Sequence, residues 1–279
     1  MYSVKEIFYT LQGEGANAGT PAVFCRFSGC NLWTGREEDR AKAVCPFCDT
    51  EFAGTDGAGG GKFETAADLA FACKLALGGV TGPGLVVLTG GEPMLQIDQA
   101  LIDALHDEGF AIAVEETNGT ITAPEDIDWI CVSPKAGADL VQTRGDELKL
   151  VYPQAALLPA AVRDLDFDHY FLQPMDGPAQ ASAPGGDSLL QSTPPWRLSV
   201  QTHKVLRSAK LSGCGPICRS ATVGCRRAVP DIYCLNGPFP LFPAPCASIE
   251  TFCLRRPYLP SRAARRPNSA STGIRSARA

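Results

Sequence analysis

Residues 85–93 read Leu85-Val86-Val87-Leu88-Thr89-Gly90-Gly91-Glu92-Pro93. This stretch decides the fold, because a short apolar run that ends in a glycine-rich turn is typical of a buried strand in a parallel sheet. A helix is expected after the turn, since Ile97, Leu101 and Leu105 recur at helical spacing. Together the strand and the helix predict one βα unit.

The same alternation extends on both sides of this unit. Five further strands are expected, at Ala22–Phe27, Ala111–Val114, Trp129–Val132, Leu148–Val151 and His169–Leu172. Thr65 is the expected N-cap of a helix with Asp68 three residues later, and the glycine-rich residues 54–61 before it are expected to form a flexible connector. Strands that alternate with helices predict an α/β fold with a parallel sheet, in which ligands gather at the carboxyl ends of the strands.

Composition limits the class of protein. The chain has 279 residues, of which 45% are hydrophobic, so it can bury a large core. No stretch approaches the roughly 20 apolar residues of a membrane span. The first residues lack the basic and apolar pattern of a signal peptide, and a cytoplasmic location is expected. The net charge of −5 argues against a general nucleic-acid binder.

Charge and composition divide the chain near residue 206. Residues 1–206 contain 13 Lys or Arg and 28 Asp or Glu, a balance of −15, whereas residues 207–279 contain 12 and 2, a balance of +10. The second part also has nine prolines, six cysteines and eleven arginines without a sustained period of 2 or 3.6. It is therefore expected to be a disordered or atypical extension. Prolines and glycines within 177–195 are expected to break any helix there.

The cysteines suggest metal chemistry. Cys45-Pro46-Phe47-Cys48 is a C-x2-C pair, and Cys30 lies fifteen positions before it. Three thiolates suit an iron–sulfur cluster, which leaves one iron open to a small molecule, or a structural zinc ion with Cys25 as its fourth ligand. Cys25 shares a strand face with Val23 and Phe27, which favours a core position. The spacing alone leaves cluster and zinc open.

Polar motifs follow several predicted strands, and each also has an ordinary structural explanation. Glu92 can accept hydrogen bonds from an ammonium group, or its turn can be a plain βα turn. Arg26 can bind a substrate carboxylate or pair within the protein, and Asp49-Thr50 offers oxygen ligands for magnesium or a helix N-cap. The remaining motifs are ligand-side loops or ordinary turns: Gln12-Gly13-Glu14-Gly15, Ser133-Pro134-Lys135, Gln173-Pro174-Met175-Asp176 and Gln201-Thr202-His203-Lys204.

As a set, these motifs resemble the radical S-adenosylmethionine superfamily and, within it, the 7-carboxy-7-deazaguanine synthase family. The resemblance covers about residues 1–206 and also includes Glu116-Thr117-Asn118-Gly119 and Trp196-Arg197-Leu198-Ser199-Val200. The usual superfamily spacing is C-x3-C-x2-C. The C-x14-C-x2-C spacing of this chain is similar to that of some members of the synthase family, in which the extra residues form a small inserted loop. The resemblance favours the cluster over zinc and implies a partial, open parallel β/α barrel.

The resemblance implies an enzyme, a carbon–nitrogen lyase that uses a [4Fe-4S] cluster, S-adenosylmethionine and Mg²⁺. A reduced flavodoxin or ferredoxin supplies one electron, and a 5′-deoxyadenosyl radical abstracts hydrogen from C6 of 6-carboxy-5,6,7,8-tetrahydropterin. The ring then contracts with loss of ammonia to 7-carboxy-7-deazaguanine, an intermediate towards queuosine. The resemblance also implies a homodimer.

A role follows from the resemblance for each matching residue. Cys30, Cys45 and Cys48 would hold the cluster, and Thr50 would ligate the magnesium ion. The substrate-binding residues would be Leu11, Gln12, Gly13, Arg26 and Thr89. The residues that bind S-adenosylmethionine would be Gly91, Glu92, Ser133, Pro134, Lys135, Gln173, Pro174, Met175 and Asp176.

The chain departs from the family pattern at its end. Family members usually stop a few residues after the His-Lys segment, and their terminal carboxylate helps to bind the substrate, whereas here 73 residues follow Leu206. Two other functions stay open. An activase of a glycyl-radical protein would lack the segments Gln12–Gly15 and Gln201–Lys204. A zinc-stabilised binding module would have no enzymatic activity.

Overall fold

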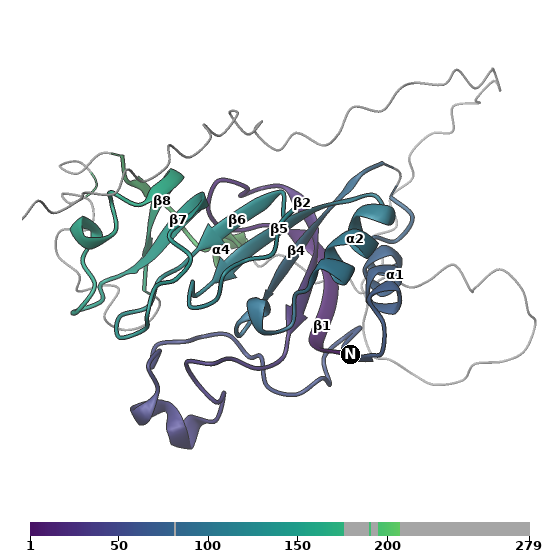
Figure 1. Cartoon of the computed structure of the whole chain (residues 1–279), viewed down its shortest axis with the longest axis horizontal. Helices are drawn as coiled ribbons and strands as arrows, with labels where there is room; N and C mark the ends of the chain where they lie inside the picture. Colours follow the sequence, from purple (N-terminus) through teal and green to yellow (C-terminus); the bar gives the residue numbers. More distant parts are fainter. Residues whose placement is uncertain (81, 176–189, 191–194, 207–279) are drawn as a thin grey trace, which may run out of the picture.

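A mixed sheet of nine strands organises the protein in a computed structural model, which describes residues 1–80, 82–175, 190 and 195–206 (Figure 1). The strands are β1 (Tyr2–Leu11), β2 (Pro21–Phe27), β3 (Gly61–Phe63), β4 (Gly84–Gly90), β5 (Phe110–Thr117), β6 (Trp129–Val132), β7 (Arg144–Tyr152), β8 (Asp166–Pro174) and β9 (Arg197–Leu198). Their order is β3-β1-β2-β4-β5-β6-β7-β8-β9, so the sheet is open, with β3 and β9 at its edges.

The direction of the strands follows the expected pattern. Strand β1 runs antiparallel to β2 and β3, and every other neighbouring pair is parallel. All six apolar strands expected from the sequence are present, and β6 has the predicted bounds. The α/β class and the largely parallel sheet are therefore confirmed.

Two helices, α1 (Ala66–Ala76) and α2 (Gln99–Asp107), lie side by side against the sheet (Figure 1). The predicted cap of α1 is confirmed, because Thr65 Oγ1 accepts a hydrogen bond from Asp68 N at 3.1 Å and the Asp68 carboxylate accepts one from Thr65 N. Asp98 caps α2 in the same manner through Leu101 N. The shorter elements are η1 (Glu37–Lys42), η2 (Pro93–Leu95), η3 (Pro159–Ala161) and α4 (Thr202–Leu206).

Two local expectations differ from the structure. Helices do not separate every pair of strands, since the described connections from β5 to β8 contain η3 but no α-helix. Prolines and glycines punctuate these connections and stop helices from forming. The glycine-rich residues 54–61 are not a free connector: Gly57 N donates to Lys5 O at 2.9 Å and Ile7 N donates to Ala58 O at 2.8 Å. These hydrogen bonds fasten the segment along β1.

The two faces of the sheet carry different side chains. One face packs against α1 and α2 in a large apolar core that includes Val23, Cys25 and Phe27. The opposite face has a smaller apolar cluster, formed by Ala22, Leu85, Val87, Ala113, Trp129 and Cys131. Beyond that cluster, towards the carboxyl ends of the strands, polar residues such as Arg26 and Thr89 share the face. Side chains alternate between the faces of a strand, so the polar face can form a site while the other stays apolar.

Across the described residues, no helix is long and apolar enough to cross a membrane. The predicted extension at 207–279 lies outside the described residues, as does most of the segment at 177–195 where a broken helix was expected.

Candidate active site

A cavity of about 480 Å³ opens over the polar face of the sheet, and it gathers most of the predicted site residues. Those that line it are Leu11, Gln12, Gly13, Arg26, Cys30, Cys45, Cys48, Thr50, Thr89, Gly91, Lys135, Gln173, Pro174 and Met175. Glu92, Ser133 and Pro134 are buried beside it without lining it. Asp176 lies outside the described residues. Segments that are distant in the sequence therefore meet at one cavity, as expected when ligands gather at the carboxyl ends of parallel strands.

The three predicted ligand cysteines come from two loops at the cavity wall. Cys30 follows β2, and Cys45 and Cys48 follow η1. Burial raises the pKa of the Cys45 thiol to about 11 and also raises the pKa of Cys48. A thiolate that is buried in this way needs a positive charge beside it. A bound metal supplies that charge, and the thiol loses its proton when it coordinates the metal.

The donor set fits a cluster better than a single zinc ion. A tetrahedral zinc site with Zn–S bonds of about 2.3 Å holds its sulfurs about 3.8 Å apart. In the part of the chain that the structure describes, the one set of three Cys, His, Asp or Glu ligand atoms within 4.8 Å of one another is Glu115, Cys131 and Glu147. The sulfur atoms of Cys30, Cys45 and Cys48 therefore do not all lie within 4.8 Å of one another, so they are not arranged around a single ion. Cys25 lies fully buried in the helix-side core, as predicted, and cannot be the fourth ligand.

Gly91 lines the cavity, whereas Glu92 is buried beside it. A Cβ atom on Gly91 would lie 2.3 Å from Gly29 O and 2.8 Å from Cys30 Cβ, so only glycine allows this close approach to Cys30. The Glu92 carboxylate is fully buried and accepts hydrogen bonds from Thr117 Oγ1 at 2.7 Å, Asn118 N at 2.7 Å and Met94 N at 3.0 Å. Burial raises the pKa of Glu92 despite these bonds. Glu92 therefore fastens the end of β5 to the turn after β4.

The Ser133-Pro134-Lys135 motif presents one side chain to the cavity. Lys135 Nζ donates to both the carbonyl and the hydroxyl of Ser133, each at 2.7 Å. Pro134 O accepts a hydrogen bond from Gln154 Nε2 at 3.3 Å. Ser133 and Pro134 therefore fix the position of the Lys135 ammonium group, which lines the cavity.

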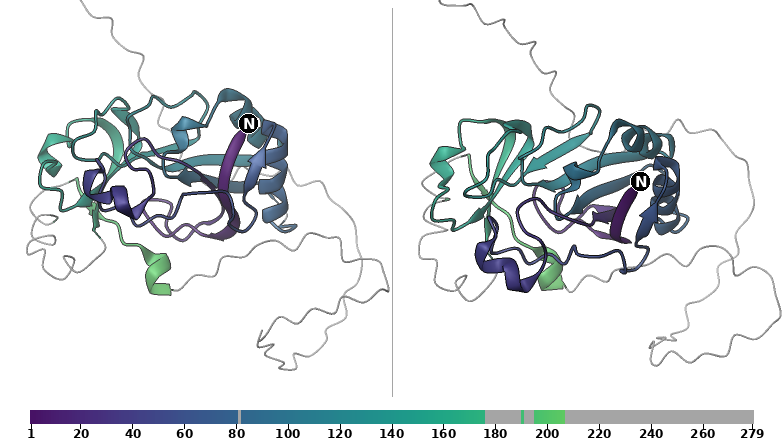
Figure 2. Two further views of the ribbon diagram at one scale, coloured as in Figure 1. Left: turned by 90° about the horizontal axis from the view of Figure 1, so that it is seen from below. Right: turned by 60° about the horizontal axis from the view of Figure 1, so that its bottom comes forward.

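Arg26 forms an ion pair within the protein, which is one of the two alternatives predicted from the sequence, and it also lines the cavity. Its Nε donates to Glu6 Oε1 at 3.0 Å, and both side chains are largely buried. Thr89 lies beside Arg26 in the register of β4 on β2. Thr50 lines the cavity as well, and its neighbour Asp49 pairs with Lys204 Nζ at 2.6 Å. Figure 2 shows α4, which carries Lys204, on the same side as the inserted segment with η1.

The loop of residues 12–17 is fastened to the end of the described chain. Thr202 N donates to Gly13 O at 3.0 Å, and Ser199 Oγ accepts a hydrogen bond from Gly15 N at 3.0 Å. A Cβ atom on Gly13 would lie 2.8 Å from His203 Nδ1, so the two segments touch closely. The segments Gln12–Gly15 and Gln201–Lys204, two separate motifs in the sequence, thus form one structure.

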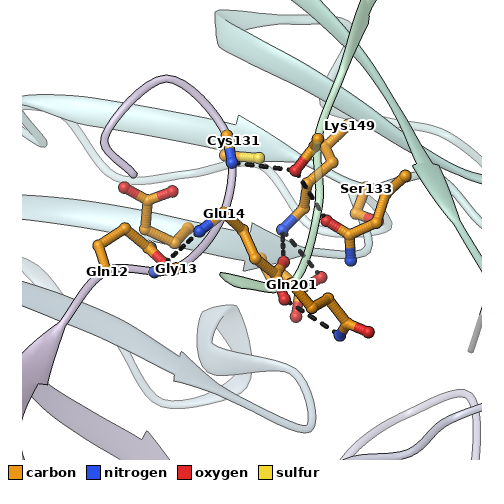
Figure 3. A network of polar contacts seen from close by, with 12 residues as sticks. Gln12, Gly13, Glu14, Cys131, Ser133, Lys149 and Gln201 are labelled. Carbon is orange, nitrogen blue, oxygen red and sulfur yellow. Dashed lines mark hydrogen bonds and ion pairs between the residues drawn. The ribbon is translucent and has the colours of Figure 1, made fainter. Parts of the chain in front are cut away.

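A buried charge network, absent from the sequence prediction, lies below this loop (Figure 3). The Lys149 side chain is 1% exposed, and its ammonium group pairs with the Glu14 carboxylate and, at 3.2 Å, with Glu116 Oε1. Gln201 Nε2 donates to the second Glu14 oxygen at 3.1 Å. Burial acts to lower the pKa of Lys149, but Glu116 and Glu14 raise it well above its usual value. Lys149 is therefore the cation that holds these carboxylates together.

Two further buried acidic residues, Glu115 on β5 and Glu147 on β7, lie on either side of Cys131 on β6. Asn17 Nδ2 donates to Glu115 Oε1 at 2.7 Å, and Ala16 N donates to Glu147 Oε2 at 2.9 Å. Cys131 Sγ lies between them, 3.4 Å from Glu147 Oε1. Burial first, and then the charge of Glu147, raise the pKa of Glu115 to about 8. Glu115 is thus largely a neutral acid near pH 7, while Lys149, Asn17 and Gln12 act in the opposite direction on it.

Replacement of Glu115 by glutamine is expected to stabilise the protein at about pH 8 and to change little at about pH 5. A carboxyl group with a pKa of 4.5 in the unfolded chain and about 8 in the folded chain binds its proton more tightly when folded. Stability therefore falls as the pH rises between these values, and glutamine, which does not titrate, removes that loss. Thermal unfolding at both pH values should show a gain of roughly several degrees at the higher one only. The exposed Glu125→Gln is the control, and equal shifts of Glu115→Gln at both pH values would contradict the expectation.

Comparison with known proteins assigns this chain to a family. A 7-carboxy-7-deazaguanine synthase of Caulobacter vibrioides is 64% identical over 206 residues, which cover 74% of this chain and 98% of that protein. The synthase of Bordetella pertussis is 60% identical over 206 residues, with the same shares covered. The chain belongs to the 7-carboxy-7-deazaguanine synthase family. This family membership confirms the resemblance seen in the sequence and makes the chain an enzyme, a lyase of the radical S-adenosylmethionine type.

Solved structures agree with this family. The crystal structure of QueE from Escherichia coli superposes with a TM-score of 0.53 at 26% identity, over 72% of this chain and 93% of that chain. No protein-family model matches the chain. The match to both the sequences and the solved structure covers about three quarters of this chain and nearly the whole of each relative.

Proposed function

We propose that this chain converts 6-carboxy-5,6,7,8-tetrahydropterin to 7-carboxy-7-deazaguanine with release of ammonia. The observation that carries the proposal is the cavity itself, in which three cysteines spaced C-x14-C-x2-C meet the residues expected to bind substrate and cofactor. The 64% identity to a named synthase over 98% of its length supports the same activity. The open sheet of parallel strands with α1 and α2 on one face is consistent with a partial β/α barrel of the radical S-adenosylmethionine type.

The proposed chemistry depends on a group that the three cysteines would hold. Cys30, Cys45 and Cys48 would hold a [4Fe-4S] cluster, and that cluster would supply the electron that cleaves S-adenosylmethionine to the radical needed at C6 of the substrate. The protein contributes position and exclusion of water, since Cys45 and the cavity floor are buried. Two observations support the cluster over a zinc-stabilised module: the three sulfurs do not all lie within 4.8 Å of one another, and Cys25 is buried in the core.

Side chains on the sheet would bind the pterin. Arg26, held by Glu6, has a fork of donors suited to the substrate carboxylate, because a guanidinium can pair through two nitrogens. Thr89 reaches the cavity beside it from β4. Leu11, Gln12 and Gly13 would line the pterin ring, and Thr50 would ligate a magnesium ion that touches the substrate.

The opposite side of the cavity would take the methionine part of S-adenosylmethionine. Gly91 brings bare backbone close to the cluster ligand Cys30, and Lys135 presents a positive charge fixed by Ser133. Glu92 would act mainly through the fold, since three donors already occupy its carboxylate, and Pro134 through the turn before Lys135. Gln173, Pro174 and Met175 line the same cavity, and Asp176 is proposed to follow them.

Partners are part of the same proposal. A flavodoxin or ferredoxin would deliver the electron, and two copies of the chain would form a homodimer in the cytoplasm. A small-molecule site in a chain of net negative charge supports a pterin ligand rather than nucleic acid. The domain is proposed to end near residue 206, and a match of 206 residues to 98% of a relative's length supports a domain of this size.

The test is anaerobic reconstitution with iron and sulfide, followed by reductant, S-adenosylmethionine and 6-carboxytetrahydropterin. Mass spectrometry should detect 7-carboxy-7-deazaguanine. Formation of 5′-deoxyadenosine without that product would favour another radical enzyme, such as a glycyl-radical activase. Binding of zinc without formation of a cluster would contradict the proposal that the three cysteines hold an iron–sulfur cluster.

Removal of residues 209–279 is expected to retain or improve this activity. The described site ends with His203 and Lys204, and relatives that match 98% of their own length extend no further. The measurement is turnover of the full chain and of the shortened chain after matched reconstitution. A shortened protein that loads a cluster but fails to bind the pterin would contradict this expectation.

A further inference from the structure

The inserted segment between Cys30 and Cys45 is folded back on itself. Leu32 O accepts hydrogen bonds from Val44 N at 3.0 Å and from Cys45 N at 3.5 Å, so the two ends of the insertion meet. Trp33 is 8% exposed and meets the ring of Phe52 edge to face at 5.6 Å between centroids. Trp33 and Phe52 therefore form a small apolar contact at the base of the insertion, beside the cavity.

Arg40, in the last turn of η1, connects this insertion to the C-x2-C turn. Its Nη1 donates to Pro46 O at 2.9 Å and to Cys48 O at 2.9 Å. Its guanidinium carbon lies 4.1 Å from the centroid of the Trp33 ring, and its Nε donates to Glu37 Oε1 at 2.6 Å. The side chain is 29% exposed, so most of it is removed from water. One side chain thus binds two backbone carbonyls of the C-x2-C turn, those of Pro46 and Cys48.

Only arginine can make this set of contacts at once. A guanidinium is planar and stacks on an aromatic face while its edge nitrogens point to separate acceptors. A lysine ammonium group could keep the charge but could not stack on Trp33 and reach two carbonyls and Glu37 together. The same contacts hold the positive charge of Arg40, which also pairs with Glu37, against the backbone of the Cys45–Cys48 turn. Arg40 therefore has two properties that substitutions can separate: its hydrogen bonds hold the turn, and its guanidinium carries a positive charge.

We propose that Arg40 is a positioning residue that fixes the Cys45–Cys48 turn in its cluster-binding shape and favours the reduced cluster by its charge. This inference rests on the proposed function, because it concerns a cluster on Cys30, Cys45 and Cys48. Reduction adds one electron from the external donor to a cluster that already carries three thiolates. A fixed cation nearby stabilises the added negative charge, and a rigid turn slows the release of iron.

The test compares Arg40→Gln, Arg40→Lys and Arg36→Gln with the wild-type full chain after anaerobic reconstitution. Arg36 is the matched control, since its side chain is 74% exposed and its ion-pair partner is Glu38 at 3.9 Å. The first readout is the rate at which a chelator removes iron from the oxidised cluster. The second is the paramagnetic resonance signal of the reduced cluster at one fixed reducing potential. Neither readout requires turnover.

Arg40→Gln is expected to release iron roughly tenfold faster, as the loss of charge-assisted hydrogen bonds implies. Its ratio of reduced to oxidised cluster should fall roughly fivefold. Arg40→Lys should keep the wild-type ratio but release iron faster, and Arg36→Gln should match the wild type in both. Wild-type behaviour of Arg40→Gln in both readouts would overturn the inference while leaving the proposed function intact. Failure of the wild-type chain itself to form a cluster would instead refute the proposed function.

Discussion

Replacement of Cys48 by alanine is expected to abolish both the cluster and the formation of 7-carboxy-7-deazaguanine. Two thiolates cannot hold three irons of a four-iron cluster, and Cys48 lies in the cavity wall with Cys30 and Cys45. The iron content, the visible absorbance and the product should therefore all fall to background. A change in packing would not explain this loss of iron and product, because Cys48 is only half-buried and lies outside the apolar core.

The matched control is Cys73→Ala, which removes a thiol of the same size from the other side of the sheet. Cys73 is fully buried against Cys25 in the helix-side core, so its loss should lower the melting temperature without affecting iron content per folded chain. A Cys48→Ala protein that still binds a four-iron cluster would show that the ligands have been assigned wrongly. Loss of the cluster in Cys73→Ala at unchanged folding would do the same.

Replacement of Lys149 by methionine is expected to cause the largest loss of stability. The Lys149 side chain is 1% exposed and its ammonium group pairs with Glu14 and Glu116, so methionine fills the space but leaves two carboxylates without their cation. Removal of one partner from a buried ion pair costs about 3–5 kcal/mol. For a domain of this size the melting temperature should fall by roughly 10 °C. The loop of residues 12–17 should also loosen, because Glu14 is part of it and accepts a hydrogen bond from Gln201.

Two further variants make this expectation specific. Lys62→Met removes an exposed lysine from β3 and should leave the melting temperature nearly unchanged. The double variant Lys149→Met with Glu14→Gln should recover part of the loss, since it neutralises one of the stranded carboxylates. Thermal unfolding followed by circular dichroism measures all three. A single variant Lys149→Met with wild-type stability would show that the buried pair contributes nothing.

The apolar strands and helix signals were predictable because they depend on local pattern. Residues 129–132 form a strand with the predicted bounds, and the Thr65 cap has the predicted partner in Asp68. Motifs at the ends of strands were predictable for the same reason, since a parallel sheet brings those ends together. Thus Arg26, Thr89 and Lys135 line one cavity although more than a hundred residues separate the first from the last.

The orientation of individual side chains was not predictable. Glu92 follows its strand as expected, but its carboxylate binds Thr117 and the backbone after β5 rather than facing the cavity. The buried network was missed because β7 was identified by its apolar residues alone. A signal did exist: Glu147 and Lys149 stand at alternate positions of an apolar strand, so both point to one face. Charged residues in such a position need a partner, which is a reason to look for a site.

The loop at residues 12–17 is held by Ser199, Gln201 and Thr202, and this contact joins the first connection of the sheet to the last helix described. During synthesis on a ribosome, the loop emerges long before the segment that fastens it. Contacts of such long range also form late in the folding of a free chain. The cavity can therefore be completed only after nearly all of residues 1–206 have left the ribosome. The order in which the cavity is assembled is therefore set by where the two halves of its wall lie in the sequence.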